Sequence, residues 1–437
     1  MSRQQPGDLQ KHRPVTTVIV VYTDIYRYIH GIYRKSAMLS NKSIRITRTA
    51  RMPDLVRISR YAKAPELGPR MLFFSGGSAL NKVSRILKNY THNSIHMVTP
   101  FDSGGSSAKL RKAFAMPSIG DLRSRLMSLA DENITGQPEV YKLFTYRFPA
   151  QAEADRLLAQ LDAMINGEDP LVHAIPNPMR RLIRNQLGYF RGAMPAGFDM
   201  RGASTGNLIL AGGYINNHQH LDPIIFLFSQ LVGVLGTVRA IVNDNLHLGA
   251  ELEDGSEVLG QHRLTGKEVA PLASPVKRLF LSDSQERREP AIAELRKKNR
   301  KLIKQADLIC YPPGSFYTSL IANLLPQGVS TAIADCDSPK IYIPNLGHDP
   351  EQIGMTLEGS VHTLLDYLRA GIADDCPDRE LLNFILIDSK RGNYPACKSL
   401  QSVRKLGIQV IDTRLISSDS APYYDAGLLV AALLSLT

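Results

Sequence analysis

Short apolar runs and helical stripes of apolar residues alternate along most of the chain. Met71 to Phe74 is a continuous apolar run, which predicts a strand buried on both faces. After a Gly-Gly turn, apolar residues recur at three- and four-residue spacing through Leu80 to Tyr90, which predicts a helix that covers a sheet. Ser94 to Thr99 is the next predicted strand. Such a strand-helix-strand unit forms a right-handed parallel crossover, so both strands end at the same sheet edge.

The pattern then stays helical from residue 130 to about 236. Apolar stripes recur in 157–164, 179–190, 207–214 and 224–235. We interpret this segment as an inserted helical subdomain. Glycine and proline cluster between Gly192 and Gly206, and we interpret that stretch as a lid.

Strand signals return after the helical segment. A predicted strand at Val238 to Val242 leads into a hairpin made of HLGAEL, the turn residues EDGS, and EVLGQHRLT. Further strands are predicted at Leu308 to Tyr311 and in KIYIPN, NFILID and GIQVID, with helices between them. Alternating strands and helices are typical of an α/β fold with a doubly wound sheet. We expect that sheet to be mostly parallel and mixed, because the β-hairpin is added to it.

Composition limits the class of protein. The 437 residues are 43% hydrophobic and 21% charged, which is ordinary for a globular protein. The early apolar run Val15 to Tyr22 is far shorter than the roughly 20 residues of a membrane helix, so we expect neither a membrane span nor export. The four cysteines lie far apart without a Cys-x-x-Cys pair, which argues against a zinc site and favours the reducing cytoplasm.

The net charge of +11 suits anionic ligands, and its distribution suggests where they bind. Much of the basic excess lies in the first seventy residues and in ELRKKNRKLIK at 294–304. In residues 1–66 basic residues alternate with tyrosines, a pattern seen in single-stranded nucleic-acid binders. Because no nucleic-acid-binding motif accompanies it, we favour a basic N-terminal extension that packs on the main body or stays a tail. We therefore predict an extension at 1–66 and an α/β domain at 67–437, with the insertion or lid at about 130–236.

Two loops rich in glycine and serine follow the first two predicted strands, where open α/β sheets bind ligands. The first contains Gly76, Gly77 and Ser78, and the second contains Asp102, Gly104, Gly105, Ser106 and Ser107, with Arg111 in the helix behind it. Backbone N–H groups in such turns bind phosphate at a helix N-terminus. The alternatives are a purely structural glycine pair and a serine-capped helix. Capping needs one such residue and the second loop has several, so we favour a ligand.

Two aspartates near these loops provide hard oxygen ligands. Asp102 ends the second strand, and Asp121 follows in PSIGD before an apolar helix. Alone, Asp121 would be an N-cap. Together the two carboxylates suit Mg²⁺, which bridges carboxylates and phosphates in phosphoryl transfer. A third turn, PPGSFYTS, again follows a strand, and its Gly314 and Ser315 are candidate phosphate contacts.

At this point the chain resembles the CofD/YvcK-like family from about Met71 to the C-terminus. FDSGGSSAKLR is similar to the family's Asp-Asp-Gly-Gly-Ser-Ser-Gly-Arg-Leu-Arg segment, and PSIGDLRSRL to its Pro-Pro-Gly-Asp-Ile-Arg-Asn segment. Further similar stretches are LFTYRF, TGNLILAG, AELEDGSEVLG, ADLICYPPGSFYTSLIANLL and KIYIPNLG. Within the family, the CofD-related proteins of the three-gene GAK system are the nearest likeness, through ITRTARMPD and SRYAKAPELG.

The resemblance implies a Rossmann-like fold and one of two activities. CofD-type members are Mg²⁺-dependent transferases that move a phospholactyl-type group from a guanosine diphosphate conjugate to a deazaflavin hydroxyl. YvcK-type members bind nucleotide sugars and regulate carbon use and cell-wall synthesis. The implied partner is thus a nucleoside-diphosphate conjugate of guanosine or uridine type, with a homodimer as one alternative for the assembly.

The resemblance also assigns residues. Asp102 and Asp121 are implied as catalytic and Mg²⁺-binding. The implied ligand-binding residues are Gly76, Gly77, Ser78, Gly104, Gly105, Ser106, Ser107, Arg111, Asn207, Gly314, Ser315, Thr318 and Asn345. Ser103 stands where the family has the second aspartate of its pair, which removes a negative charge beside a metal. The first hypothesis from the resemblance is a transferase of the 2-phospho-L-lactate type. The alternative, which Ser103 favours, is a non-catalytic nucleotide-sugar binder.

Overall fold

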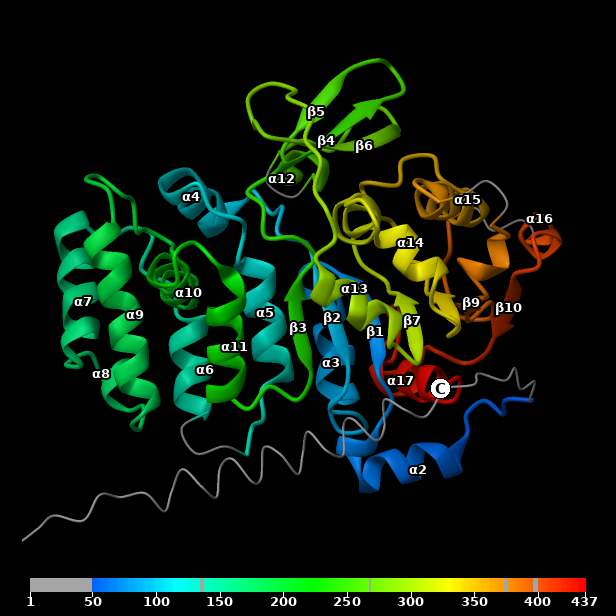
Figure 1. Cartoon of the computed structure of the whole chain (residues 1–437), viewed down its shortest axis with the longest axis horizontal. Coiled ribbons are helices and arrows are strands. Elements are labelled where there is room, and N and C mark those ends of the chain that lie inside the picture. The colour runs from blue at the N-terminus through cyan, green and yellow to red at the C-terminus, as the bar shows by residue number, and fades with distance from the viewer. Residues whose placement is uncertain (1–48, 134–136, 267–268, 373–375, 396–399) are drawn as a thin grey trace, which may run out of the picture. The chain divides into compact units, whose positions relative to one another are not determined.

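The computed structural model describes residues 49–133, 137–266, 269–372, 376–395 and 400–437. Residues 50–437 form one compact unit (Figure 1). Its central sheet contains seven strands: β1 (Met71–Ser75), β2 (Ile95–Val98), β3 (Thr237–Ala240), β7 (Leu308–Tyr311), β8 (Lys340–Tyr342), β9 (Phe384–Ile387) and β10 (Gln409–Asp412). Their order is β10-β9-β8-β7-β1-β2-β3, and all the pairings are parallel. The expected α/β fold is confirmed.

The predicted hairpin is present but does not join the central sheet. β4 (His247–Leu252) and β5 (Glu257–Leu259) pair with β6 (Val276–Ser282) in a separate antiparallel sheet, so the expectation of one mixed sheet was wrong. The second hairpin strand is also shorter than expected. It ends before Gly260, whose φ of +99° departs from strand geometry, and QHRL forms the helical turn α12 (Gln261–Leu264).

Helices cover both faces of the central sheet. On one face lie α2 (Leu55–Lys63), α3 (Asn81–Leu87) and α17 (Ala426–Leu434); on the other lie α13 (Lys297–Lys304), α14 (Val329–Ala334), α15 (Leu357–Arg369) and α16 (Gln401–Lys405). Side chains of β1 alternate between the two cores: Met71 and Phe73 face α3 and α17, whereas Leu72 and Phe74 face the opposite layer. This explains why the sequence of β1 is apolar throughout.

The strand order reverses between β1 and β7. From β1 the chain proceeds to β2 and β3 on one side, and later to β8, β9 and β10 on the other. The loops after β1 and β7 consequently leave the sheet beside each other, at the position where doubly wound sheets bind ligands.

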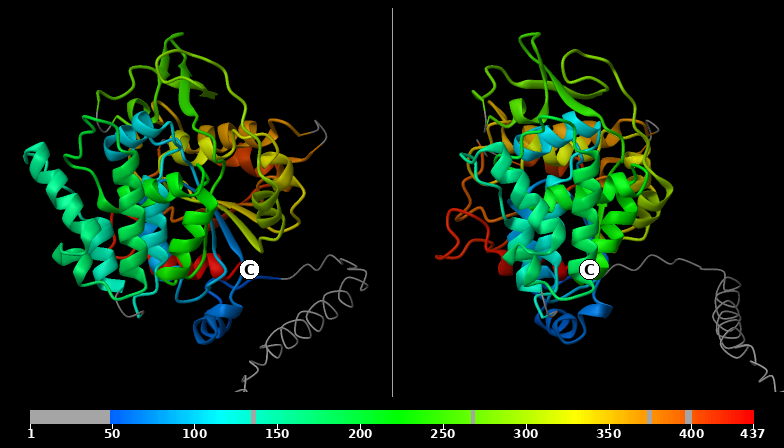
Figure 2. Two further views of the ribbon diagram at one scale, coloured as in Figure 1. Left: turned by 60° about the vertical axis from the view of Figure 1, so that its left-hand side comes forward. Right: turned by 90° about the vertical axis from the view of Figure 1, so that its left-hand side faces the viewer.

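The crossover from β2 to β3 contains α4 (Gly105–Phe114), α5 (Gly120–Leu129) and the helical insertion. The insertion comprises α6 (Gln137–Thr145), α7 (Ala154–Asn166), α8 (Pro170–His173), α9 (Met179–Ala193), α10 (Thr205–Asn216) and α11 (Leu221–Leu231). Its ends meet where the Leu235 N–H donates to the Leu129 carbonyl at 2.9 Å. Figure 2 shows these helices gathered beside the β3 edge, and they form a core of their own with α5.

The N-terminal extension is described only from residue 49. There α2 packs beside α17, and the Asp54 N–H donates to the Ser435 hydroxyl at 2.9 Å. The predicted boundary at 66/67 stays a prediction, and the tyrosine-rich basic stretch lies outside the described residues. In the described ranges, no helix combines the length and apolar character needed to cross a membrane.

We predict that Gly212→Ala destabilises the insertion. A Cβ at Gly212 in α10 would lie 1.9 Å from the backbone oxygen of Gln186 in α9, so the helices must separate. We expect the free energy of unfolding to fall by about 1–3 kcal/mol in urea denaturation. Gly188→Ala is the matched control, because no atom lies within 4 Å of its Cβ position. It should be neutral or stabilising by up to about 1 kcal/mol, and equal losses in the two variants would contradict the argument.

Candidate functional site

A cavity of about 430 Å³ lies where β1, β2 and β7 end. Both glycine-serine loops, the start of α5, α10 and α12 contribute to its wall. The lining residues are Gly77, Ser78, Ala79, Asp102, Gly104, Gly105, Ser106, Ser107, Gly120, Asp121, Arg123, Ser124, Arg147, Asn207, Gln261, His262, Thr265, Ser315 and Ser319. Ten of the residues singled out from the sequence therefore meet in one place: Gly77, Ser78, Asp102, Gly104, Gly105, Ser106, Ser107, Asp121, Asn207 and Ser315.

The first loop is held by Arg125 of α5, which is fully buried. Its guanidinium donates to the Ser84 hydroxyl at 2.7 Å and to the carbonyls of Gly77 and Gly76 at 3.1 and 3.4 Å. Burial lowers the pKa of Arg125 to about 10, so it stays protonated at neutral pH. Gly76 itself does not line the cavity: a Cβ there would lie 2.3 Å from the Ser319 hydroxyl, so its role is close packing.

The second loop is supported from behind by Arg111. This buried side chain donates to the carbonyls of Phe101, Asp102 and Leu246 at 3.2, 3.3 and 2.6 Å, and to Asn245 Oδ1 at 3.0 Å. Burial lowers its pKa to about 10. Arg111 is therefore placed outside the cavity wall, where it holds the loop in shape. At the start of α4, the Gly104 N–H donates to Asp102 Oδ1 at 3.1 Å.

Two glycines lie close to the polar groups of the cavity. A Cβ at Gly77 would be 3.0 Å from Asp121 Oδ1, and a Cβ at Gly120 would be 2.8 Å from the Ser107 hydroxyl and 3.5 Å from Asp102 Oδ2. A side chain at Gly77 would therefore crowd Asp121, and one at Gly120 would crowd Ser107.

The donor set fits magnesium. Among the described residues no group of three or more His, Cys, Asp or Glu could hold a metal ion. Mg²⁺, however, commonly uses only one or two carboxylates together with substrate phosphates and water. Asn207 adds a further hard oxygen, because its buried Oδ1 has no hydrogen-bond partner among the described residues. Asp102, Asp121 and Asn207 are thus suitable ligands, and the magnesium itself stays a prediction.

Two arginines of the cavity were not found from the sequence. Arg123 of α5 donates to the Phe144 carbonyl at 2.8 Å and to the Ser204 hydroxyl. Burial, and then the charge of Arg147, lower the pKa of Arg123 to about 10. Both arginines lie in stretches that resemble the CofD/YvcK-like family: Arg147 in LFTYRF and Arg123 in PSIGDLRSRL. Their direction depends on how α5 and α6 pack, which the local pattern does not fix.

A histidine of α12, the helical turn that follows β5, lines the cavity. His262 Nδ1 lies 2.8 Å from the Ser103 hydroxyl, which also accepts the His262 backbone N–H at 3.2 Å. In the tautomer in which Nδ1 accepts the Ser103 hydroxyl proton, Nε2 carries the ring hydrogen and is a donor for a ligand. His262 was not among the predicted site residues, because the sequence pattern of EVLGQHRLT favours a strand there.

The glycine- and proline-rich stretch interpreted as a lid runs beside the same loops. Lys109 of α4 forms a 2.8 Å salt bridge with Asp199, and the Ser106 hydroxyl accepts the Ser204 N–H at 3.3 Å. Lys109 and then Arg201 hold the pKa of Asp199 well below its usual range. The stretch is thereby fastened to the second loop, and its opening stays a prediction.

Most of the third turn is occupied by internal partners. Asn345 Oδ1 accepts the Gly314 N–H at 2.8 Å, and Asp349 Oδ2 accepts the Phe316 N–H at 2.9 Å. Glu351 accepts the Thr318 N–H at 2.8 Å and the Thr318 hydroxyl at 2.5 Å. Gly314, Thr318 and Asn345 thus do not line the cavity, and their donors are used within the protein. Of the predicted residues in this turn, Ser315 reaches the wall.

The buried Glu351 generates a pH prediction. Burial, and then the charge of Asp349, raise the pKa of Glu351 from its ordinary value of 4.5 to about 7. Between these two values the folded state binds more protons than the unfolded state, so stability should fall as pH rises from about 4.5 to 7. Glu351→Gln should flatten this part of the profile of unfolding midpoint against pH. The exposed Glu286→Gln is the control, and an equally flat profile in both variants would contradict the assignment.

Comparisons with known proteins identify the family of the chain. A model of the family described as 2-phospho-L-lactate transferase CofD matches residues 71–416. The gluconeogenesis factor of Bacillus subtilis (strain 168) is 27% identical over 357 residues, which cover 80% of this chain and 92% of that protein. A relative from Nostoc sp. (strain PCC 7120) is also 27% identical, over 82% of this chain, which spans 65% of that protein's length.

A solved structure shows the same fold. The crystal structure of a UPF0052 family protein from Bacillus halodurans superposes with a TM-score of 0.62 at 23% identity, covering 84% of this chain and 99% of that one. The family model spans far more than half of the sequence, from the start of β1 to beyond β10. The chain therefore belongs to the CofD family, as its loops had indicated.

Proposed function

We propose that the cavity binds the diphosphate of a nucleoside-diphosphate conjugate, and that the protein transfers a phospholactyl-type group from it to an acceptor hydroxyl with Mg²⁺. One observation carries the proposal: two carboxylates and two arginines line the same cavity as two glycine-serine loops. The cations Arg123 and Arg147 suit phosphate oxygens. Asp102 and Asp121 suit a metal that shares those oxygens. Membership in the CofD family supports the same chemistry.

The chain's own groups would position the donor. Backbone N–H groups of the two loops and the N-terminus of α4 attract phosphate oxygens, and Arg123 adds positive charge in a partly desolvated wall. Asp102, Asp121 and Asn207 would hold Mg²⁺, which when bound supplies neutralisation of negative charge on the diphosphate. Arg125 fixes the first loop, so these donors need little rearrangement when charge develops.

The transfer has a simple atomic balance. The acceptor oxygen forms a bond to the phosphorus of the transferred group while the bond from that phosphorus to the bridging oxygen breaks. The nucleoside monophosphate leaves with the electron pair, and the acceptor's proton passes to solvent. Holding the diphosphate rigidly in line is the protein's main contribution to such a step.

Ligand binding tests the proposal first. We predict that guanosine or uridine diphosphate conjugates raise the unfolding midpoint of the wild type, and that Mg²⁺ increases the shift, since a bound ligand stabilises by mass action. Asp102→Asn and Asp121→Asn should each lose the Mg²⁺-dependent part, and where turnover is seen they should lower it about 10²–10³-fold. Asp155→Asn, an exposed carboxylate of α7, is the control. A full Mg²⁺-dependent shift in both site variants would refute the metal assignment.

A second function is favoured by the Ser103–His262 contact. Ser103 uses its hydroxyl to hold His262 and adds no second carboxylate beside Asp102, which lowers the negative charge available to a metal. A nucleotide-sugar binder without turnover fits this feature, and relatives named gluconeogenesis factor support a regulatory role. Stabilisation by a uridine-diphosphate sugar that needs no Mg²⁺ and yields no product would favour this function over transfer.

We predict that His262 contacts the ligand through Nε2. His262→Ala removes one hydrogen-bond donor, which is worth about 1 kcal/mol and so about fivefold in ligand affinity. Ser103→Ala should weaken affinity by a smaller factor, because the ring stays but its orientation is no longer fixed. Titration calorimetry measures both, with the exposed neighbour variant Arg263→Ala as the control. Unchanged affinity in His262→Ala would remove His262 from the site.

A further inference from the structure

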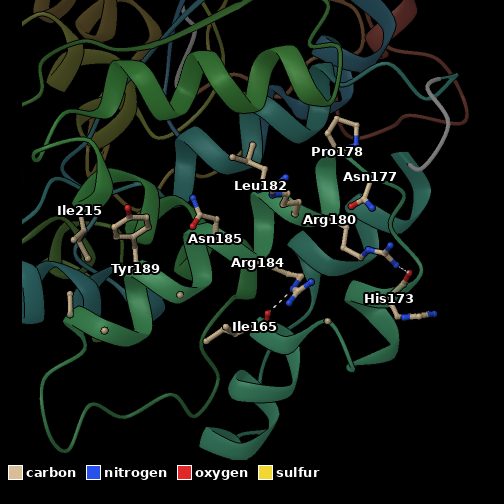
Figure 3. Close-up of a pocket in the computed structure, with 15 residues that line it drawn as sticks. Ile165, His173, Asn177, Pro178, Arg180, Leu182, Arg184, Asn185, Tyr189 and Ile215 are labelled. Atoms are coloured by element: carbon tan, nitrogen blue, oxygen red, sulfur yellow. Dashed lines mark hydrogen bonds between the residues drawn. The ribbon is translucent and has the colours of Figure 1, made fainter. Parts of the chain in front are cut away.

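A second hollow lies on the helical insertion and shares no residue with the candidate site. It is a groove of about 1270 Å³ along α9, bordered by Ile165 and His173 from the α7–α8 side and by Ile215 of α10 (Figure 3). Its wall runs from Asn177 to Ala193. The helical part, Met179 to Ala193, is about 22 Å long at 1.5 Å per residue, or about four turns of a helix.

The groove is basic at one end, and its charges are unpaired. Arg180, Arg181 and Arg184 line it, and no described aspartate or glutamate does. None of these three arginines forms a salt bridge with a described residue, whereas Arg191 on the same helix pairs with Asp162 at 3.0 Å. An incoming carboxylate would therefore find several guanidinium donors without displacing an internal partner.

Two of these guanidiniums are already oriented. Arg180 Nη1 donates to the His173 carbonyl at 3.0 Å, and Arg184 Nε donates to the Ile165 carbonyl at 2.6 Å (Figure 3). A guanidinium has five N–H donors, so each of these bonds fixes the group and leaves donors for a ligand. Little side-chain entropy is then lost on binding.

The other end of the groove is lined by uncharged residues, two of which are glycines. Gly188 and Gly192 are four residues apart in α9, and no atom lies within 4 Å of either Cβ position. Glycine inside a helix is destabilising relative to alanine, so its use there needs a reason. In α10 close packing explains Gly212, whose Cβ would meet the Gln186 backbone, but the described chain offers no such reason at Gly188 or Gly192. Their use suits the close approach of a backbone from outside.

We propose that this face of α9 docks a helix of a partner protein that carries acidic residues at one end. The acidic end would pair with Arg180, Arg181 and Arg184, and the other end would pack on the two glycines beside Tyr189, which is 46% exposed. A nucleic acid fits less well, because its phosphates carry charge along the whole length and the glycine half offers none. A second copy fits less well, because the chain has a net charge of +11 and α9 has no acidic residue.

The test uses the full chain and defined peptides. Three fluorescent 18-residue amphipathic helical peptides share one apolar face and carry Glu, Gln or Lys at the polar positions of one half. In fluorescence anisotropy, the Glu peptide should bind at least tenfold more tightly than the Gln peptide, and added salt should weaken it. Arg181→Glu with Arg184→Glu should cost at least tenfold. Gly188→Leu should also cost at least tenfold, although it leaves every arginine in place.

The controls separate docking from folding and from other occupants. Arg156→Glu, an exposed arginine of α7 outside the groove, should bind the Glu peptide like the wild type, and unfolding midpoints verify that each variant is folded. Equal affinity for the Glu and Gln peptides would overturn the proposal, as would Glu-peptide binding that survives both the arginine and the glycine variants. A single-stranded RNA 12-mer or a phosphatidylglycerol vesicle that outcompetes the Glu peptide, or self-association lost in Gly188→Leu, would assign the groove to another occupant and overturn it too.

Discussion

The buried guanidinium of Arg125 is the interaction on which the candidate site depends. It comes from α5 and reaches the Ser84 hydroxyl of α3 and the carbonyls of Gly76 and Gly77, so it joins two helices and the loop after β1. A fully buried charge is costly unless hydrogen bonds compensate it. Because the same helix begins at Gly120 and carries Asp121 in its first turn, the contacts that fix Arg125 also fix one carboxylate of the cavity.

The site is assembled from parts that play different physical roles. The central sheet aligns the ends of β1, β2 and β7, and the insertion supplies Asn207 from α10. The helical turn α12, which follows β5, supplies His262, whose ring is held by Ser103. Ser103, which stands where the family has its second aspartate, thus also orients the His262 ring. The third turn is different, since Asp349 and Glu351 already bind most of its N–H groups and make it a packed support.

Arginines line two separate surfaces of this chain, the candidate cavity and the groove along α9. In the cavity, Arg123 is partly buried and donates to a backbone carbonyl and a hydroxyl group, which suits a small anion bound in a fixed pose. On α9, Arg180, Arg181 and Arg184 border an open groove, and none of the three has a carboxylate partner among the described residues. The sequence places these arginines in MRRLIRNQLGYFRGA. Much of the excess of basic residues, however, lies in the first seventy residues and in 294–304, so the pattern of charge did not indicate α9. Pairing with nearby carboxylates, which only the tertiary structure reveals, separates a binding surface from an ordinary solvated one.

The sequence by itself determined the fold class, the strands that follow one another in the central sheet, and the convergence of Asp102, Asp121 and the two glycine-serine loops. These features depend on local periodicity and on the rule that parallel strands end at a common edge. The tertiary structure alone decided that the hairpin builds its own sheet, that Arg111 and Gly314 face inward partners, and that Arg123, Arg147 and His262 reach the cavity. The direction of a side chain depends on how distant elements pack, and residue spacing carries no information on that packing.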